Sequence, residues 1–146
     1  MFLSAEEVKG YVEGIIHEET QFADRGLDLT VDRVSKVKSP TELDFGGSEE
    51  KLGELEKLEP KKRSPEDDYG WWNLEGGIYI IEFNEDIEVT DGLGLITPLE
   101  RLTAGGSFHN TLLLENYSGV RPILFVNSSG LAIKENARTS RLYIWR

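Results

Sequence analysis

Cysteine is absent from this chain of 146 residues, and its absence excludes disulfide bonds, thiolate zinc sites and cysteine nucleophiles. The two histidines, His17 and His109, are too few for a His-rich metal site. No apolar run approaches the ~20 residues that a membrane helix needs, and the first residues lack the basic region and apolar run of a secretory signal. The sequence therefore predicts a soluble, cytoplasmic protein with no membrane partner.

Basic residues are also scarce: 16 of them face 27 acidic residues, which gives a net charge of −11. This balance argues against a nucleic-acid partner, which requires a basic surface. A small anionic ligand stays possible because a few local arginines can hold phosphates, although the charge is also explained by solubility alone. The dinucleotide, P-loop and serine-hydrolase motifs are all missing, so these three classes fail at the motif level.

The length suits one domain that spans residues 1–146. Short apolar strands recur about every ten residues between Gly, Asn, Asp and Ser turns, which predicts an all-β sandwich or barrel. Ser4 and Glu7 form a capping box that opens a short N-terminal helix, expected to end near His17. Residues 26–34 alternate as in a half-buried strand, a pattern that by itself favours an exposed Asp28.

Residues 39–68 differ from the rest of the chain because they are highly charged and rich in turn residues. We expect a charged insertion or mobile loop here. The spacing of Leu52, Leu55 and Leu58 alternatively indicates a short helix. The basic run at residues 61–63 is typical of a solvated loop, since acidic residues flank it on both sides.

The stretch from residue 93 to 119 concentrates the chemistry. A strand that stops at Pro98, a charged turn that ends in glycines, and a second strand over residues 107–114 are expected there. Glu115 follows three leucines, and a carboxylate at the end of an apolar strand can take a proton from an attacking water. The alternative is a turn carboxylate in solvent. His109 lies on the second strand, where a lone histidine is more often structural than catalytic.

Tyr117 follows Glu115 by two residues, and its ring can stack on a sugar. Backbone N–H groups near Gly105 and Gly106 can face phosphate oxygens. This combination is compatible with a nucleotide site.

Four segments resemble the dUTPase and dCTP deaminase superfamily, most closely its archaeal dUTPase-like branch. They are the opening residues 2–16, Gly-Leu-Asp-Leu-Thr at 26–30, residues 69–85, and Asn-Ala-Arg-Thr-Ser-Arg-Leu at 136–142. The resemblance implies a distorted jelly-roll β-barrel and a homotrimer with sites at subunit interfaces. It also implies a deoxynucleoside triphosphate substrate, dUTP first, hydrolysed with water to dUMP and pyrophosphate, with Mg²⁺ carried on the triphosphate.

The resemblance also assigns site residues. It makes Glu115 the catalytic residue and places Asp28 near the metal, indirectly through water. The nucleotide-binding residues that it implies are Arg101, Gly106, Asn110, Thr111, Leu112, Tyr117 and Arg138.

Three departures from the family pattern leave alternatives open. Of the phosphate motif Pro-Arg-Ser-Ser-Leu-x-Arg only Pro98 and Leu102 match, and Glu100 would repel a triphosphate. The turn that leads to Tyr117 is one residue shorter than in the family. If the missing residue lies earlier in the chain, Leu114 instead of Glu115 takes the catalytic position. A leucine, Leu124, stands where a deaminase needs a glutamate, which argues against dCTP deamination. A catalytically inactive trimeric nucleotide-binding or scaffold homologue is therefore the alternative to a hydrolase.

Overall fold

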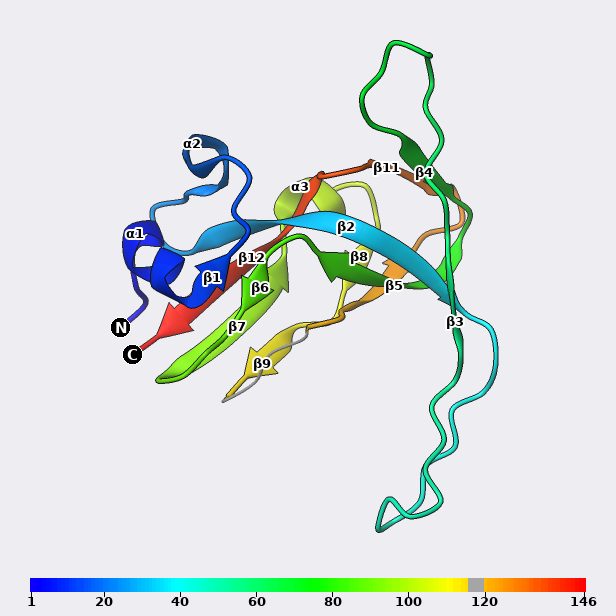
Figure 1. The fold of residues 1–146 in the computed structure, drawn as a ribbon, viewed down its shortest axis with the longest axis horizontal. Coiled ribbons are helices and arrows are strands. Elements are labelled where there is room, and N and C mark those ends of the chain that lie inside the picture. The colour runs from blue at the N-terminus through cyan, green and yellow to red at the C-terminus, as the bar shows by residue number, and fades with distance from the viewer. Residues whose placement is uncertain (116–119) are drawn as a thin grey trace.

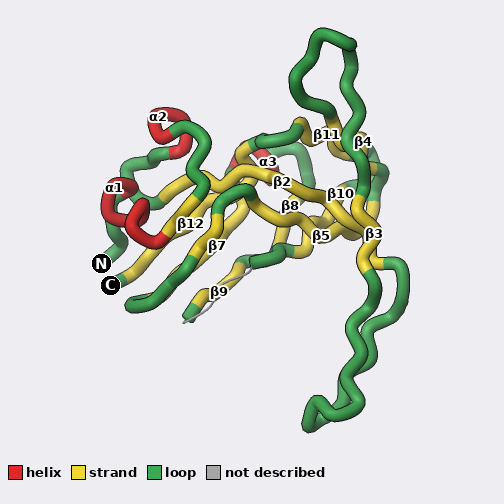
Figure 2. The backbone as a smooth tube through the Cα atoms, in the orientation of Figure 1, coloured by secondary structure: helices red, strands yellow, loops and turns green. Residues whose placement is uncertain are grey.

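A curled β-sheet forms the body of the protein in a computed structural model, which describes residues 1–115 and 120–146 (Figures 1 and 2). Its strands follow the order β8-β10-β5-β2-β12-β7-β9, with β3 paired to β2. Their bounds are β2 Leu27–Val37, β3 Leu55–Lys57, β5 Gly77–Phe83, β7 Leu93–Pro98, β8 Phe108–His109, β9 Leu112–Leu114, β10 Ile123–Val126 and β12 Arg138–Trp145. The predicted all-β barrel is confirmed.

The smaller elements cap this sheet. Two further two-stranded sheets pair β1 with β6 and β4 with β11. These elements and the helices are α1 Ala5–Val8, the 3-10 helix η1 Lys9–Tyr11, β1 Val12–Glu13, α2 Glu18–Gln21, β4 Trp71–Leu74, β6 Asp86–Ile87, α3 Glu100–Thr103 and β11 Leu131–Lys134. None of the described helices has the length and apolar content that a membrane span requires.

The sheet curls back on itself at residues 110–111. Strands β8 and β9 stand at opposite ends of the strand order, yet only these two residues separate them in the sequence. The expected continuous strand over 107–114 is therefore two strands. Asn110 stabilises the crossing, because its side-chain carbonyl accepts a hydrogen bond from the Ile123 N–H at 2.8 Å.

The N-terminal capping box is confirmed: the Ser4 hydroxyl accepts from the Glu7 N–H, and the Glu7 carboxylate accepts from the Ser4 N–H. The helix ends at Tyr11 rather than near His17. Val12 leaves it to pair with Ile87 across a β-ladder. Gly14 then adopts a φ of 87°, and the Asn84 carbonyl oxygen lies 2.9 Å from where a Cβ would be, so only glycine fits this turn without strain.

The charged segment forms strand β3 and two projecting loops instead of a helix (Figure 1). Leu52 and Leu55 are both exposed, so the leucine spacing marks no buried helical face. The edge of β2 at residues 35–37 pairs with β3, and this pairing holds residues 55–57 in a strand instead of a helix. Residues 38–54, the arm, form an extended excursion whose two sides are joined by the Glu42–Lys51 bridge. Residues 59–70 form the second loop.

Strand β2 connects two apolar cores. Leu27 and Leu29 belong to a cluster with residues of β7 and β12, while Val31 and Val34 belong to a second cluster with β5 and β10. All four side chains are fully buried. The strand thus fixes both halves of the barrel relative to each other, and the residues on its opposite face gain fixed positions too.

Candidate functional site

Asp28 is buried, with 2% of its surface exposed, although the alternating pattern favoured an exposed side chain. Both carboxylate oxygens are used. Oδ2 accepts from Arg138 Nη1 at 3.0 Å, and Oδ1 accepts from Arg141 Nε at 2.7 Å. The ladder between β2 and β12 creates this arrangement, because Arg141 lies directly opposite Asp28. The prediction from the alternating pattern was wrong because that pattern contains no information about two partners more than a hundred residues away in the sequence.

This group, the Asp28 triad, carries one excess positive charge, since two guanidinium groups share one carboxylate. The side chain of Asp28 is almost fully buried, whereas those of Arg138 and Arg141 are about one third exposed. The hydrogen bond that Arg141 donates to Asp28 raises the pKa of Arg141 above its ordinary value. A buried carboxylate that orients two partly exposed arginines is suited to holding an anion such as phosphate.

Arg101 and Arg138 line the same cavity of about 440 Å³, which we call the arginine cavity. Arg101 reaches it from α3, and Arg138 from the start of β12. The Leu99 N–H donates to the Thr139 carbonyl at 2.9 Å and ties the beginning of α3 to β12. The structure thus brings together two of the predicted nucleotide-binding residues, while Glu100 on α3 is exposed and does not line this cavity.

A buried polar network lies behind the triad. The Glu85 carboxylate accepts from the Thr30 N–H at 2.8 Å, from the Thr30 hydroxyl at 2.6 Å and from Gln21 Nε2 at 2.8 Å. Gln21 also donates to the Asp28 carbonyl at 2.9 Å. Burial raises the pKa of Glu85, and the hydrogen bonds from Thr30 and Gln21 oppose that shift. The network positions the backbone of Asp28.

His109 is a structural residue here. Its ring nitrogen Nδ1 lies 2.7 Å from the Asn110 carbonyl, which requires Nδ1 to donate. Nε2 is then the acceptor for the Ser140 hydroxyl at 2.7 Å. The side chains of His109 and Ser140 are both buried, and burial lowers the pKa of His109. The contact ties β8 to β12, close to the crossing at residues 110–111.

A second cavity of about 670 Å³, the hairpin cavity, opens between β9 and the turn from β5 to β6. Leu112 and Leu114 line it, as do Glu85 and Arg121. Leu114 also packs in the first core, whereas Glu115 is exposed at the end of β9. The predicted Tyr117 lies outside the described residues.

The remaining predicted residues line neither cavity. Asn110 is occupied with the Ile123 N–H, and Thr111 is exposed at the crossing. Gly106 has a φ of 84° and faces the Asn127 side chain, which donates to the Gly105 carbonyl at 2.7 Å. In one copy of the chain the described nucleotide-binding residues are therefore divided among the arginine cavity, the hairpin cavity and the 106–111 segment, and Asp28 and Glu115 line neither cavity.

The described residues contain no group of three His, Asp or Glu side chains arranged to hold a metal ion. Asp28, the residue expected near the metal, uses both oxygens for arginines. The described side chains therefore do not fit a protein-held magnesium ion.

Three participants in the site escaped the sequence analysis. Arg141 stands in the resembling segment 136–142, but only Arg138 was assigned a role. Glu85 closes the resembling segment 69–85, but its polar neighbours Asn84 and Asp86 gave no sign of its burial. Gln21 gave no signal, because its position depends on where α2 packs.

No protein-family model matches the chain. It is 31% identical over 138 residues to a protein of Methanosarcina acetivorans, and 30% identical to one of Methanosarcina mazei. Both are named "Probable deoxyuridine 5'-triphosphate nucleotidohydrolase". Each match covers 92% of this chain and 77% of the relative.

The fold is similar to a crystal structure of 2'-deoxycytidine 5'-triphosphate deaminase from Agrobacterium tumefaciens. The TM-score is 0.70 at 13% identity, and the match covers 99% of this chain and 48% of that one. This chain thus spans about half the length of the deaminase, and the likeness concerns the fold alone. The sequence relatives go further: they show that the chain belongs to the deoxyuridine 5'-triphosphate nucleotidohydrolase family of the dUTPase and dCTP deaminase superfamily.

Proposed function

We propose that the protein hydrolyses a deoxynucleoside triphosphate, dUTP first, to the monophosphate and pyrophosphate. The names of its relatives support this activity. The structural observation that carries it is the net positive Asp28 triad beside Arg101, on a chain whose total charge is −11. A local excess of arginine on an acidic protein is an arrangement that selects phosphate groups.

In this proposal Arg101 and Arg138 contact phosphate oxygens, and Asp28 keeps Arg138 in place. Glu115 orients or deprotonates the attacking water, a role that its exposed position leaves accessible to solvent. Leu112 reads the base through backbone groups: β9 pairs with β7 on one side, and among the described strands no other strand pairs with it. Tyr117 packs on the sugar.

We propose a homotrimer, as the resemblance implies, and the division of these residues supports a site shared between copies of the chain. Among the described residues, none lines both the arginine cavity and the hairpin cavity. A site that needs phosphate ligands from one cavity and base-reading groups from the other is completed when a neighbouring copy supplies one of them. The remaining predicted residues are Gly106, Asn110 and Thr111. They lie in the sequence between Arg101, which lines the arginine cavity, and Leu112, which lines the hairpin cavity.

Magnesium enters this proposal as part of the substrate, a Mg²⁺–dUTP complex. The described carboxylates form no cage for it. An ion coordinated by the triphosphate needs none, because magnesium commonly keeps several waters and is bound through substrate phosphates. We further propose that residues 1–146 act as one domain in the cytoplasm.

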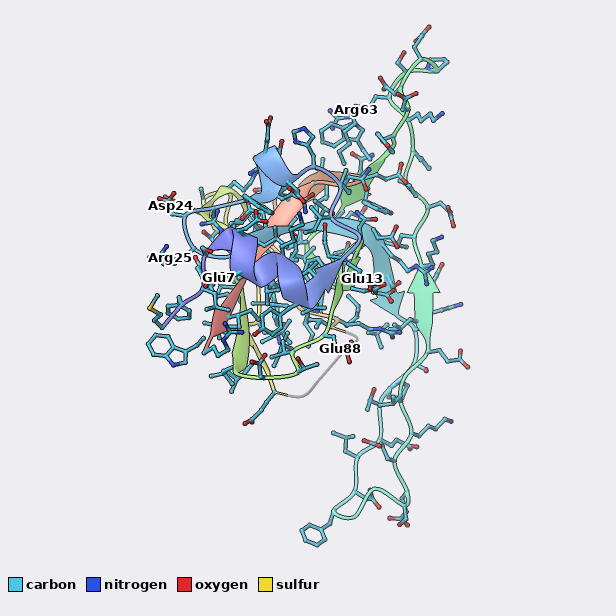
Figure 3. The ribbon with its side chains drawn as sticks, turned by 60° about the vertical axis from the view of Figure 1, so that its left-hand side comes forward. Glu7, Glu13, Asp24, Arg25, Arg63 and Glu88 are labelled. Atoms are coloured by element: carbon cyan, nitrogen blue, oxygen red, sulfur yellow. The ribbon has the colours of Figure 1, made fainter. Side chains whose placement is uncertain are left out.

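The test is pyrophosphate release from a panel of deoxynucleoside triphosphates with magnesium present. We expect release from dUTP and no ammonia from dCTP, because the buried Leu124 cannot move protons. Glu115→Gln should reduce dUTP hydrolysis by at least about 100-fold, the lower range for losing a general base. Glu88→Gln is the matched control, since Glu88 is an exposed carboxylate on the β6 side (Figure 3). Full activity of Glu115→Gln would remove Glu115 from the mechanism.

The burial of Leu114 supports a second candidate, a nucleotide-binding homologue without hydrolysis. If Leu114 rather than Glu115 occupies the catalytic position, that position holds an apolar core residue, and no general base is present to take a proton from water. No pyrophosphate release from any nucleotide, together with a rise in melting temperature on adding dUTP, would favour this candidate. Neither release nor a thermal shift would leave a scaffold role.

A further inference from the structure

Cationic side chains gather around Trp71, outside the Asp28 triad. The Arg63 guanidinium lies 3.6 Å from the centre of the Trp71 ring, and the Lys134 ammonium lies 5.8 Å from it. Lys61 and Lys36 line a cavity with the same indole. Among the described residues, none of these four cations forms a salt bridge, although Lys9, Arg33, Arg121 and Arg146 do. Four cations without a salt-bridge partner among the described residues therefore lie around one indole.

A cavity beside Trp71, the Trp71 pocket, has a volume of about 350 Å³; Lys36 and Lys61 line it, whereas Arg63 and Lys134 do not. Its lining residues are Lys36, Leu58, Glu59, Lys61, Trp71, Trp72, Asn73, Leu74, Glu75 and Tyr79. Two carboxylates thus stand beside the cations, and the apolar part is formed by aromatic rings and leucines. Such a cavity suits an apolar side chain carried by an acidic segment.

The arm is an acidic segment with exposed apolar side chains. Residues 39–54 contain five acidic residues against one basic residue. Leu43 and Leu52 are mostly exposed, and Phe45 at the tip is 109% exposed. The tip is nevertheless ordered, because the Asp44 carboxylate accepts from the Gly47 N–H at 2.7 Å and from the Glu49 N–H at 2.9 Å. These hydrogen bonds lower the pKa of Asp44. An ordered turn that presents a bare phenylalanine is suited to docking.

The arm cannot reach the Trp71 pocket of its own chain. From Val37 to Phe45 the extended backbone covers roughly 26 Å, at about 3.3 Å per residue. Figure 1 shows the arm leaving β3 in the direction opposite to the loop of residues 59–70, which carries Lys61 and Arg63. A partner must therefore supply either the pocket or the arm.

We propose that Phe45 of one copy seats in the Trp71 pocket of a second copy, with the acidic arm lying along Lys61 and Arg63. Arm and pocket are different surfaces, so the contact is head-to-tail, and repetition forms a ring if the rotation between copies closes and an open filament if it does not. Docking would bury roughly 150–250 Å² of the phenylalanine, and charge complementarity would orient the arm. The observations that support this interface do not depend on the proposed hydrolysis or on the Asp28 triad.

Cross-linking of the full-length chain tests the interface, because any introduced cysteine is unique in a cysteine-free protein. One tagged copy carries Ser48→Cys beside Phe45 on the tip, and the other carries Asn73→Cys, an exposed residue that lines the pocket. We expect a short bis-maleimide to join the two copies. Asp24→Cys replaces Asn73→Cys as the control, since Asp24 is exposed and lies across the body from Arg63 (Figure 3). Equal yields with both acceptors would overturn the proposal.

Two changes then test what holds the contact. Phe45→Ser should weaken self-association by about 10- to 100-fold, as expected for the loss of an aromatic anchor. Arg63→Glu should weaken it as well, and raising the salt concentration should reduce cross-linking to Asn73→Cys. Cross-linking that survives both substitutions contradicts docking by Phe45. A stable monomer by mass measurement at cross-linking concentrations also contradicts it.

Discussion

Replacing Asp28 with asparagine should destabilise the protein strongly. The substitution keeps the size of the side chain but removes the charge that Arg138 and Arg141 share across β2 and β12. Each charge-assisted hydrogen bond is worth about 1.5–3 kcal/mol. Because both guanidinium groups are about one third exposed, water recovers part of that energy. We expect a loss of about 2–4 kcal/mol in the free energy of unfolding.

Urea denaturation measures this loss directly, and the slope of the transition should stay unchanged because the exposed area on unfolding does not differ. A 3 kcal/mol loss corresponds to a fall in melting temperature of roughly 6–12 °C for a chain of this size. Asp32→Asn is the control, since Asp32 lies exposed on the same strand. If Asp28→Asn costs no more than Asp32→Asn, the triad does not stabilise the fold and our account of its charges is wrong.

Two further predictions concern backbone and titration. Gly14→Ala should cost about 1–2 kcal/mol by urea denaturation, because φ is 87° and the Asn84 carbonyl crowds the new Cβ, whereas Gly10→Ala has open space and should cost less than 0.5 kcal/mol. For His109, burial lowers the folded-state pKa below the ordinary 6.5, so the unfolded chain binds the proton more tightly. The free energy of unfolding should not depend on His109 above pH 6.5 and should fall as the pH drops below it. His109→Gln should make that fall less steep. Equal dependence on pH in the two proteins would contradict a buried neutral ring.

Local signals in the sequence were reliable where local interactions decide the structure. Ser4 and Glu7 form the predicted capping box because both partners lie within one turn. The strand over residues 26–34 was also predicted, since its apolar residues fill the two cores. The end of the first helix was missed because Val12 gains a ladder partner, Ile87, that lies 75 residues further along the chain.

The candidate site was harder to predict because its parts meet only in three dimensions. Arg101 and Arg138 were named from the resemblance, and they do line one cavity. The burial of Asp28 was missed, since it depends on the register between β2 and β12. The leucine spacing at 52–58 matched a helix, but the open edge of β2 offered backbone hydrogen bonds that a charged, exposed helix could not match.

The distribution of charge connects the two proposals. Most carboxylates of this chain face solvent, and at physiological salt their field is screened over about 8–10 Å. A phosphate or an acidic arm is therefore repelled over most of the surface but attracted at close range wherever cations exceed carboxylates. The Asp28 triad with Arg101 and the surroundings of Trp71 are two such places. Since Trp71 lines both the arginine cavity and the Trp71 pocket, the two attractive regions are neighbours. A docked arm would then place its carboxylates next to the arginines that bind phosphate and would repel a triphosphate there. Triphosphate affinity should therefore rise in Phe45→Ser, even though Phe45 touches neither arginine.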